Sequence, residues 1–60
     1  MSAPLPPVLV VDDEKNMRLS LHAMLGDEGY HARTVESAEQ GLKLLGQEEF
    51  FMVITDARLG

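Results

Sequence analysis

Cysteine and tryptophan are absent from this 60-residue chain, and only 5% of its residues are aromatic. Without cysteine, the chain can form neither disulfides nor thiolate metal sites. Its two histidines, His22 and His31, are too few and too isolated to indicate a structural zinc site. A single domain of this size without such cross-links has a net stability of only about 3–5 kcal/mol.

Positive charge is also scarce, since five Lys and Arg stand against ten Asp and Glu, for a net charge of −5. An acidic surface repels phosphates, so we expect no direct binding to nucleic acid. No apolar run approaches the roughly 20 residues that span a bilayer. Residues 1–7 lack the basic and apolar parts of a signal peptide. We therefore expect a soluble, cytoplasmic protein without membrane contact.

The chain is instead rich in short apolar segments, and 45% of its residues are hydrophobic, as in globular domains. Residues 1–7 are a Pro-rich segment that we expect to be mobile. The rest alternates between strand-like and helix-like patterns. The predicted elements are strand 8–11, helix 15–28, strand 30–35, helix 37–47 and strand 51–54.

The first strand and first helix have the clearest patterns. Residues 8–11 (VLVV) are continuously apolar, which is typical of a central parallel strand covered on both faces. In the following helix, four apolar residues recur at helical spacing and predict its inward face: Met17, Leu21, Met24 and Leu25. Gly29 is the better candidate for the C-terminal cap, ahead of Gly26.

The second helix has a capping-box pattern, with Ser37 as N-cap and Gln40 three residues later. Ala38, Leu42 and Leu45 are its predicted inward face. Beyond it, Phe50 and Phe51 are adjacent, so a strand would point them to opposite faces and leave one exposed.

Alternation of strands and helices predicts a parallel sheet of the α/β class. Right-handed crossovers with the second and third strands on either side of the first give the strand order 2-1-3, with the helices on opposite faces. Ligands of such folds bind beyond the carboxyl ends of the strands where the order reverses. Here that point lies between the first and third strands.

Three carboxylates follow these two strands: Asp12 and Asp13 after the first, and Asp56 after the third. An acidic pair before a helix often only complements the helix dipole. Three carboxylates at neighbouring strand ends would repel one another without a cation, and oxygen-only ligands suit Mg²⁺. We therefore expect Asp12, Asp13 and Asp56 to converge on one Mg²⁺ site.

Three segments together resemble the receiver domain of two-component response regulators: residues 8–14 (VLVVDDE), Gly29–Tyr30 and residues 53–59 (VITDARL). The residues around Asp56 (TDARL, 55–59) look most like those of receivers of the nitrogen-regulator type, which precede sigma-54-activating domains. The resemblance implies a flavodoxin-like, doubly wound fold in which residues 8–60 form the N-terminal half of the domain. The later Ser/Thr, Lys and aromatic switch residue of the family would then fall beyond Gly60.

The resemblance also implies a role for each site residue. Asp56 matches the phosphoacceptor that takes a phosphoryl group from a sensor histidine kinase. Asp13 matches a direct Mg²⁺ ligand, Asp12 a ligand acting through water, and Arg58 a ligand through its backbone carbonyl. A protein of this kind is not an enzyme, and it would control transcription through an output domain missing here.

Two other functions stay open at this stage. The half-domain could self-associate as a homodimer through the exposed edge of the third strand. It could also be a fragment of a metal-dependent phosphohydrolase, although such enzymes usually have Asp-x-Asp after the first strand. Arg18 and Arg33 are expected to be solvated charges, and His22 a surface residue.

Overall fold

The computed structural model describes residues 6–55 and contains five elements in the predicted order. Most boundaries agree with the sequence patterns to within one or two residues, and the third strand begins and ends one residue later than predicted. The elements are β1 (Val8–Val11), α1 (Lys15–Asp27), β2 (Ala32–Val35), α2 (Ala38–Leu45) and β3 (Met52–Thr55).

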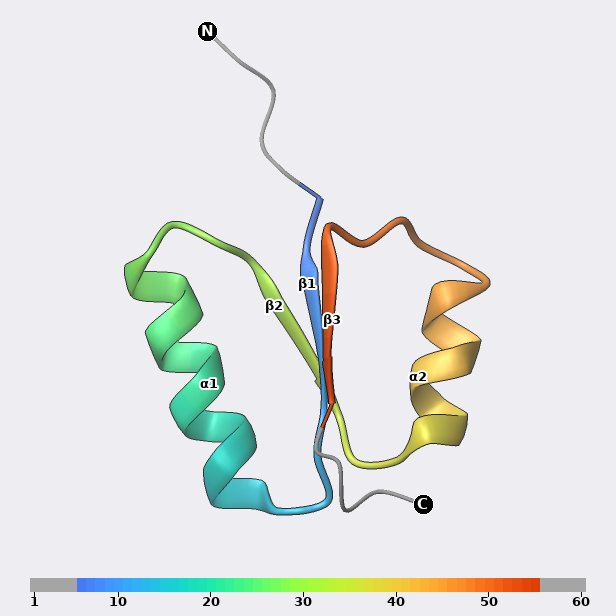
Figure 1. Ribbon diagram of the computed structural model, residues 1–60, viewed down its shortest axis with the longest axis horizontal. Helices are drawn as coiled ribbons and strands as arrows, with labels where there is room; N and C mark the ends of the chain where they lie inside the picture. The colour runs from blue at the N-terminus through green and yellow to red at the C-terminus, as the bar shows by residue number, and fades with distance from the viewer. Residues whose placement is uncertain (1–5, 56–60) are drawn as a thin grey trace, which may run out of the picture.

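The three strands form one parallel sheet in the order β2-β1-β3, which confirms the predicted topology. In register, Val11 at the end of β1 lies opposite Val35 of β2 and Thr55 of β3. The helices lie on opposite faces of the sheet, with α1 on one side and α2 on the other (Figure 1). The first crossover leads from β1 to β2, and the second leads from β2 past β1 to β3. Right-handed crossovers that run in opposite directions across a sheet place their helices on opposite faces.

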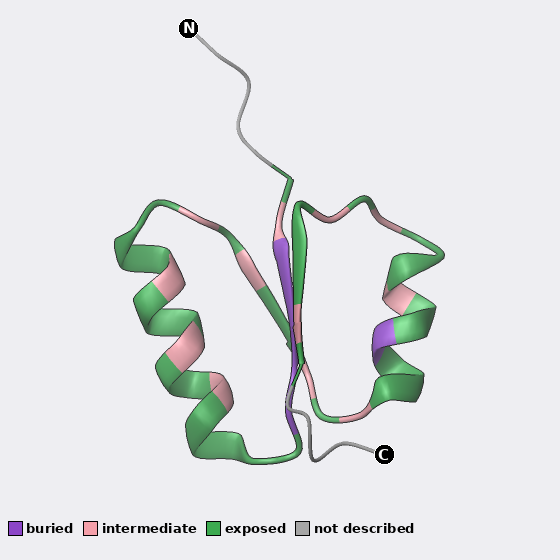
Figure 2. Cartoon of the chain, viewed as in Figure 1, coloured by how far each residue is buried: buried purple, intermediate pink, exposed green. Residues whose placement is uncertain are grey.

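The core of the molecule is β1. Its four side chains are at most 5% exposed, and Figure 2 shows β1 as the main buried segment of the described chain. This confirms that the continuous apolar run is a central strand. Covered by a strand on each side and a helix on each face, β1 removes its apolar surface from water along its whole length.

Local hydrogen bonds that the sequence predicts terminate α1 and start α2. Gly29, at a φ of 90°, follows α1, and its amide donates to the Gly26 carbonyl at 3.0 Å. The Tyr30 amide donates to the Leu25 carbonyl at 2.9 Å, which completes a Schellman motif. The C-cap residue itself is Glu28, and Gly29 directly after it terminates α1, one residue later than a C-cap in the strict sense. Glycine suits this position because it adopts a positive φ without strain.

At the start of α2, the Ser37 hydroxyl accepts a hydrogen bond from the Gln40 amide at 3.2 Å. The Gln40 side chain reaches back to the Glu36 amide at 3.0 Å, one residue before the cap. The predicted bond between the Ser37 hydroxyl and the Gln40 amide is therefore confirmed. The return bond of a capping box would reach the amide of Ser37, but the Gln40 side chain bonds to the amide of Glu36 instead.

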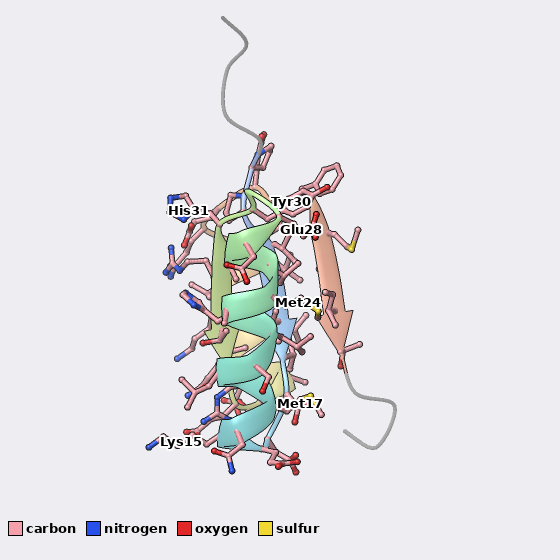
Figure 3. The ribbon with its side chains drawn as sticks, turned by 90° about the vertical axis from the view of Figure 1, so that its left-hand side faces the viewer. Lys15, Met17, Met24, Glu28, Tyr30 and His31 are labelled. Carbon is pink, nitrogen blue, oxygen red and sulfur yellow. The ribbon has the colours of Figure 1, made fainter. Side chains whose placement is uncertain are left out.

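The predicted inward faces of the helices are only partly covered. In α1, Leu21 and Leu25 are half-buried, whereas Met17 and Met24 are exposed and lie on the β3 side of the helix (Figure 3). In α2, Ala38, Leu42 and Leu45 face the sheet, as predicted, because they line a hollow between α2 and β3, but they are not buried there. All three are exposed, and Leu42 reaches 69%.

The distance of the helices from β3 explains why these inward-facing residues stay exposed. Within residues 6–55, no Cα atom of either helix lies within 8 Å of a Cα atom of β3, although both helices approach β1 and β2. The buried residue of α2 is Gly41, where an added Cβ would lie 3.1 Å from Cγ2 of Val11. The close approach of α2 to the sheet therefore occurs at a glycine. Leu42 and Leu45 lie on the β3 side of this contact and line the hollow between α2 and β3.

Candidate functional site

The carboxyl ends of the three strands lie at one edge of the sheet, and the loops that follow β1 and β2 leave from this edge (Figure 1). The register makes the strands end level, because Val11, Val35 and Thr55 occupy paired positions. Residues that directly follow β1 therefore start at the edge where α/β folds of this kind bind ligands.

Asp12 and Asp13 begin the loop after β1, as the sequence predicts. Asp12 is buried, at 4% exposure, whereas Asp13 is exposed. The Asp12 amide donates to the Val35 carbonyl at 3.1 Å, which extends the β1–β2 ladder by one residue. Its Oδ1 accepts from the Glu14 amide at 2.9 Å. Asp12 is thus fixed against the sheet, and Asp13 is presented to solvent.

Arg18 also belongs to this edge. Its Nη1 donates to the Asp12 carbonyl at 2.7 Å, from the second turn of α1. The expectation of a solvated charge is therefore wrong for Arg18, which is half-buried and bonded to the loop. The sequence feature that could have indicated this bond is a basic residue six positions after the aspartate that follows the strand. That feature predicts a contact only once α1 is known to pack on β1.

Arg33 is likewise paired, with its Nη1 2.8 Å from Oε2 of Glu48. Both side chains are partly exposed, so this pair ties β2 to the α2–β3 connection only weakly. His22 is exposed, as predicted, and lines a shallow hollow with Lys15, Arg18 and Thr34 between α1 and β2.

Asp56 and Arg58 lie outside the described residues, so their predicted roles stay predictions. Within residues 6–55, Asp12 and Asp13 are not joined by a third His, Cys, Asp or Glu in an arrangement that could hold a metal ion. The described part of the site therefore consists of two carboxylates and the groups that hold Asp12.

A second hollow lies on the opposite side of β1, between α2 and β3. It is lined almost wholly by apolar side chains, among them Leu42, Leu45 and Val53. Among the described residues, none that lines this hollow is charged, and the hollow separates the leucines of α2 from β3. Neither helix in residues 6–55 has the length and apolar composition that crossing a bilayer requires.

The family described as the response regulator receiver domain matches residues 8–60. The chain belongs to this family. The receiver resemblance is thereby confirmed, and the β2-β1-β3 sheet is the first part of its flavodoxin-like fold.

Curated relatives of this receiver include a putative response regulator and a transcriptional regulatory protein. It is 39% identical over 49 residues to "Putative response regulator NtrX-like" of Rickettsia bellii, which covers 82% of this chain and 10% of that protein. It is 38% identical over 52 residues to "Transcriptional regulatory protein GlrR" of Escherichia coli K12, covering 87% and 12%. The chain thus spans only about a tenth of the length of these relatives. No solved structure matches it significantly.

Proposed function

We propose that this receiver accepts a phosphoryl group on Asp56 from the phosphohistidine of a sensor histidine kinase, with Mg²⁺ bound beside it. The observation that carries the proposal is the level ending of β1 and β3. Val11, which precedes Asp12, is the Cα partner of Thr55, which precedes Asp56 in the sequence. Neighbouring parallel strands that end level favour a shared site for the residues that follow them.

The transfer itself is a substitution at phosphorus. A carboxylate oxygen of Asp56 bonds to phosphorus while the P–N bond of the phosphohistidine breaks. The electron pair of that bond stays on the imidazole, which takes up a proton, and Asp56 becomes an acyl phosphate. Such a reaction depends mainly on positioning and on neutralising charge on the phosphoryl oxygens.

The residues at the end of β1 suit Mg²⁺. They offer carboxylate oxygens only, from a buried Asp12 and an exposed Asp13, and Mg²⁺ prefers oxygen ligands and retains several waters. We assign Asp13 and Asp56 as direct ligands, Asp12 as a ligand through water, and the Arg58 carbonyl as a further ligand. Bound there, the ion would supply positive charge against the phosphoryl oxygens.

The biological output that we propose is control of transcription, supported by the similarity of this chain to the transcriptional regulatory protein GlrR. We place the protein in the cytoplasm, as a phosphoacceptor that turns over no substrate as an enzyme. Because its net charge is −5, this segment itself would not bind nucleic acid, and another part of the protein would make that contact.

Self-association of the 60-residue chain is a second candidate, favoured by the state of β3. Met52 and Val53 are 48% and 44% exposed, and β3 is an edge strand of the described sheet. A second copy that pairs with this edge would cover both its backbone groups and its apolar side chains. Closed twofold pairing is the simplest form that such a contact takes.

Labelling with acetyl phosphate and Mg²⁺, followed by intact mass measurement, tests the phosphoacceptor proposal in the full-length protein. The proposal predicts one added phosphoryl group per chain that is stable in acid and lost in base. Continuous hydrolysis of a general phosphate ester would indicate a phosphohydrolase instead. Absence of both would leave a binding module and contradict phosphotransfer.

A further inference from the structure

Three hydrogen bonds hold Asp12, and their partners lie in β2, in the β1–α1 loop and in α1. Its amide donates to Val35 of β2 at 3.1 Å, and its Oδ1 accepts from the Glu14 amide at 2.9 Å. Its carbonyl accepts from Nη1 of Arg18 at 2.7 Å. The first two bonds involve backbone groups of neighbouring segments. The third is supplied by the side chain of Arg18, from α1.

The start of α1 depends on these bonds. Glu14 occupies the N-cap position but makes no side-chain cap bond, and the first turn of α1 contains no acidic residue. The Arg18 amide donates to the Glu14 carbonyl at 3.1 Å, while its guanidinium bonds to Asp12. Arg18 thereby closes a ring of hydrogen bonds through Glu14 and Asp12, and it joins the helix to the end of β1.

We propose that Arg18 is a positioning residue for the cation site: by bonding the Asp12 carbonyl, it holds the loop that presents Asp12 and Asp13. This inference rests on the proposed function, because it assigns Mg²⁺ to those carboxylates. Groups that orient metal ligands through hydrogen bonds contribute to metal affinity although they do not touch the metal. A loop that is already ordered before binding loses less conformational entropy when the ion binds.

The charge of Arg18 has an effect of the opposite sign, which makes the role testable. A guanidinium beside carboxylates repels a divalent cation from them. If Arg18 acted only through its charge, its removal would strengthen Mg²⁺ binding. If it acts by holding the loop, its removal weakens Mg²⁺ binding even though a repelling charge is lost.

The matched control is Lys15, the first residue of α1. It is exposed, carries the same charge, lies at the loop end of the helix, and lines the same hollow as Arg18 (Figure 3). Arg18→Met keeps a long side chain but removes both the donor and the charge. Lys15→Met removes the charge alone. Both variants are compared with the unsubstituted full-length protein.

Two measurements test the inference. In metal-free protein, hydrogen exchange of the Glu14 amide, followed by NMR, is expected to accelerate about tenfold in Arg18→Met and to stay unchanged in Lys15→Met. In a Mg²⁺ titration followed by the shifts of the Asp13 and Glu14 amides, Arg18→Met is expected to raise the dissociation constant about tenfold. Lys15→Met is expected to leave it unchanged or lower it.

Unchanged exchange at Glu14, or Mg²⁺ binding by Arg18→Met as tight as in the unsubstituted protein, would overturn the role of Arg18. If Arg18→Met does not fold, Arg18→Lys keeps the charge, and the same two measurements are expected to show smaller effects in the same direction. Asp13→Ala separates the positioning role of Arg18 from the proposed metal site. Loss of Mg²⁺ binding in Asp13→Ala with full binding in Arg18→Met refutes the positioning role alone. Full binding in Asp13→Ala refutes the proposed metal site.

Discussion

β1 and β3 have similar sequences and very different surroundings. Both are four-residue, mostly apolar strands followed by aspartate in the sequence, VLVV before Asp12 and MVIT before Asp56. The side chains of β1 are at most 5% exposed, whereas Met52 and Val53 of β3 are nearly half exposed. The difference comes from the position of each strand in the sheet and not from its composition. Local sequence indicates a strand, and the order of the strands decides which strand becomes the core.

The largest effect that distinguishes the two strands is expected from truncating one residue in each. Leu9→Ala removes a fully buried side chain and is expected to cost about 2–5 kcal/mol, which is comparable with the whole stability of a domain this small. Val53→Ala, in the exposed strand, is expected to cost less than about 1 kcal/mol. Urea denaturation of the 60-residue chain followed by far-UV circular dichroism measures both. Equal losses would contradict the assignment of the core to β1.

Association is the next effect, and it concerns β3 alone. Sedimentation equilibrium of the 60-residue chain is expected to show self-association that Val53→Lys weakens by about tenfold or more, because lysine on an edge strand opposes pairing. Ser20→Lys adds the same charge on the exposed side of α1 and is expected to leave association unchanged. A chain that stays folded and monomeric at every concentration would show that the exposed edge needs no partner.

Two helical glycines sharpen the contrast between the faces of β1. Gly26 has no heavy atom within 4 Å of an added Cβ, so Gly26→Ala is expected to stabilise the chain by up to about 1 kcal/mol. At Gly41, the added Cβ would lie 3.1 Å from Val11, a buried side chain with little rotational freedom. Gly41→Ala is therefore expected to destabilise by about 1 kcal/mol. Thermal unfolding of both variants tests the pair, and equal stabilisation would show that α2 approaches β1 less closely.

The smallest effect is expected from the ion pair between Arg33 and Glu48. Its atoms are 2.8 Å apart, but the two side chains are 49% and 32% exposed. A double-mutant cycle with Arg33→Met and Glu48→Gln is expected to give a coupling below about 1 kcal/mol, and less at high salt. A larger coupling would mean that the α2–β3 connection is held to β2 more firmly than the exposed geometry indicates.

Features that depend on adjacent residues could be predicted from the sequence. The central strand, the end of α1 at Gly29, the first bond of the Ser37 cap and the strand order 2-1-3 all agree with the structure. The strand order follows because few topologies satisfy right-handed crossovers around one buried strand.

Features that depend on distances between elements could not be predicted. Helical periodicity identified one face of α2, but it could not show that Gly41 allows the approach while Leu42 and Leu45 stay exposed. In the site, the positions of Asp12 and Asp13 at the end of β1 were predictable. The bond from Arg18 to the Asp12 carbonyl was not, because it requires the packing of α1 against β1. The convergence of Asp56 and Arg58 on this edge stays a prediction.

The most direct test of the phosphoacceptor role is to compare the unsubstituted full-length protein with Asp56→Asn after incubation with acetyl phosphate and Mg²⁺. Intact mass spectrometry with peptide mapping measures the extent and position of labelling. Asparagine keeps the size of the side chain but lacks the carboxylate nucleophile. We predict stoichiometric labelling at Asp56 and none in Asp56→Asn. Full labelling of Asp56→Asn, or labelling at another residue of the unsubstituted protein, would contradict the assignment of Asp56 as the phosphoacceptor.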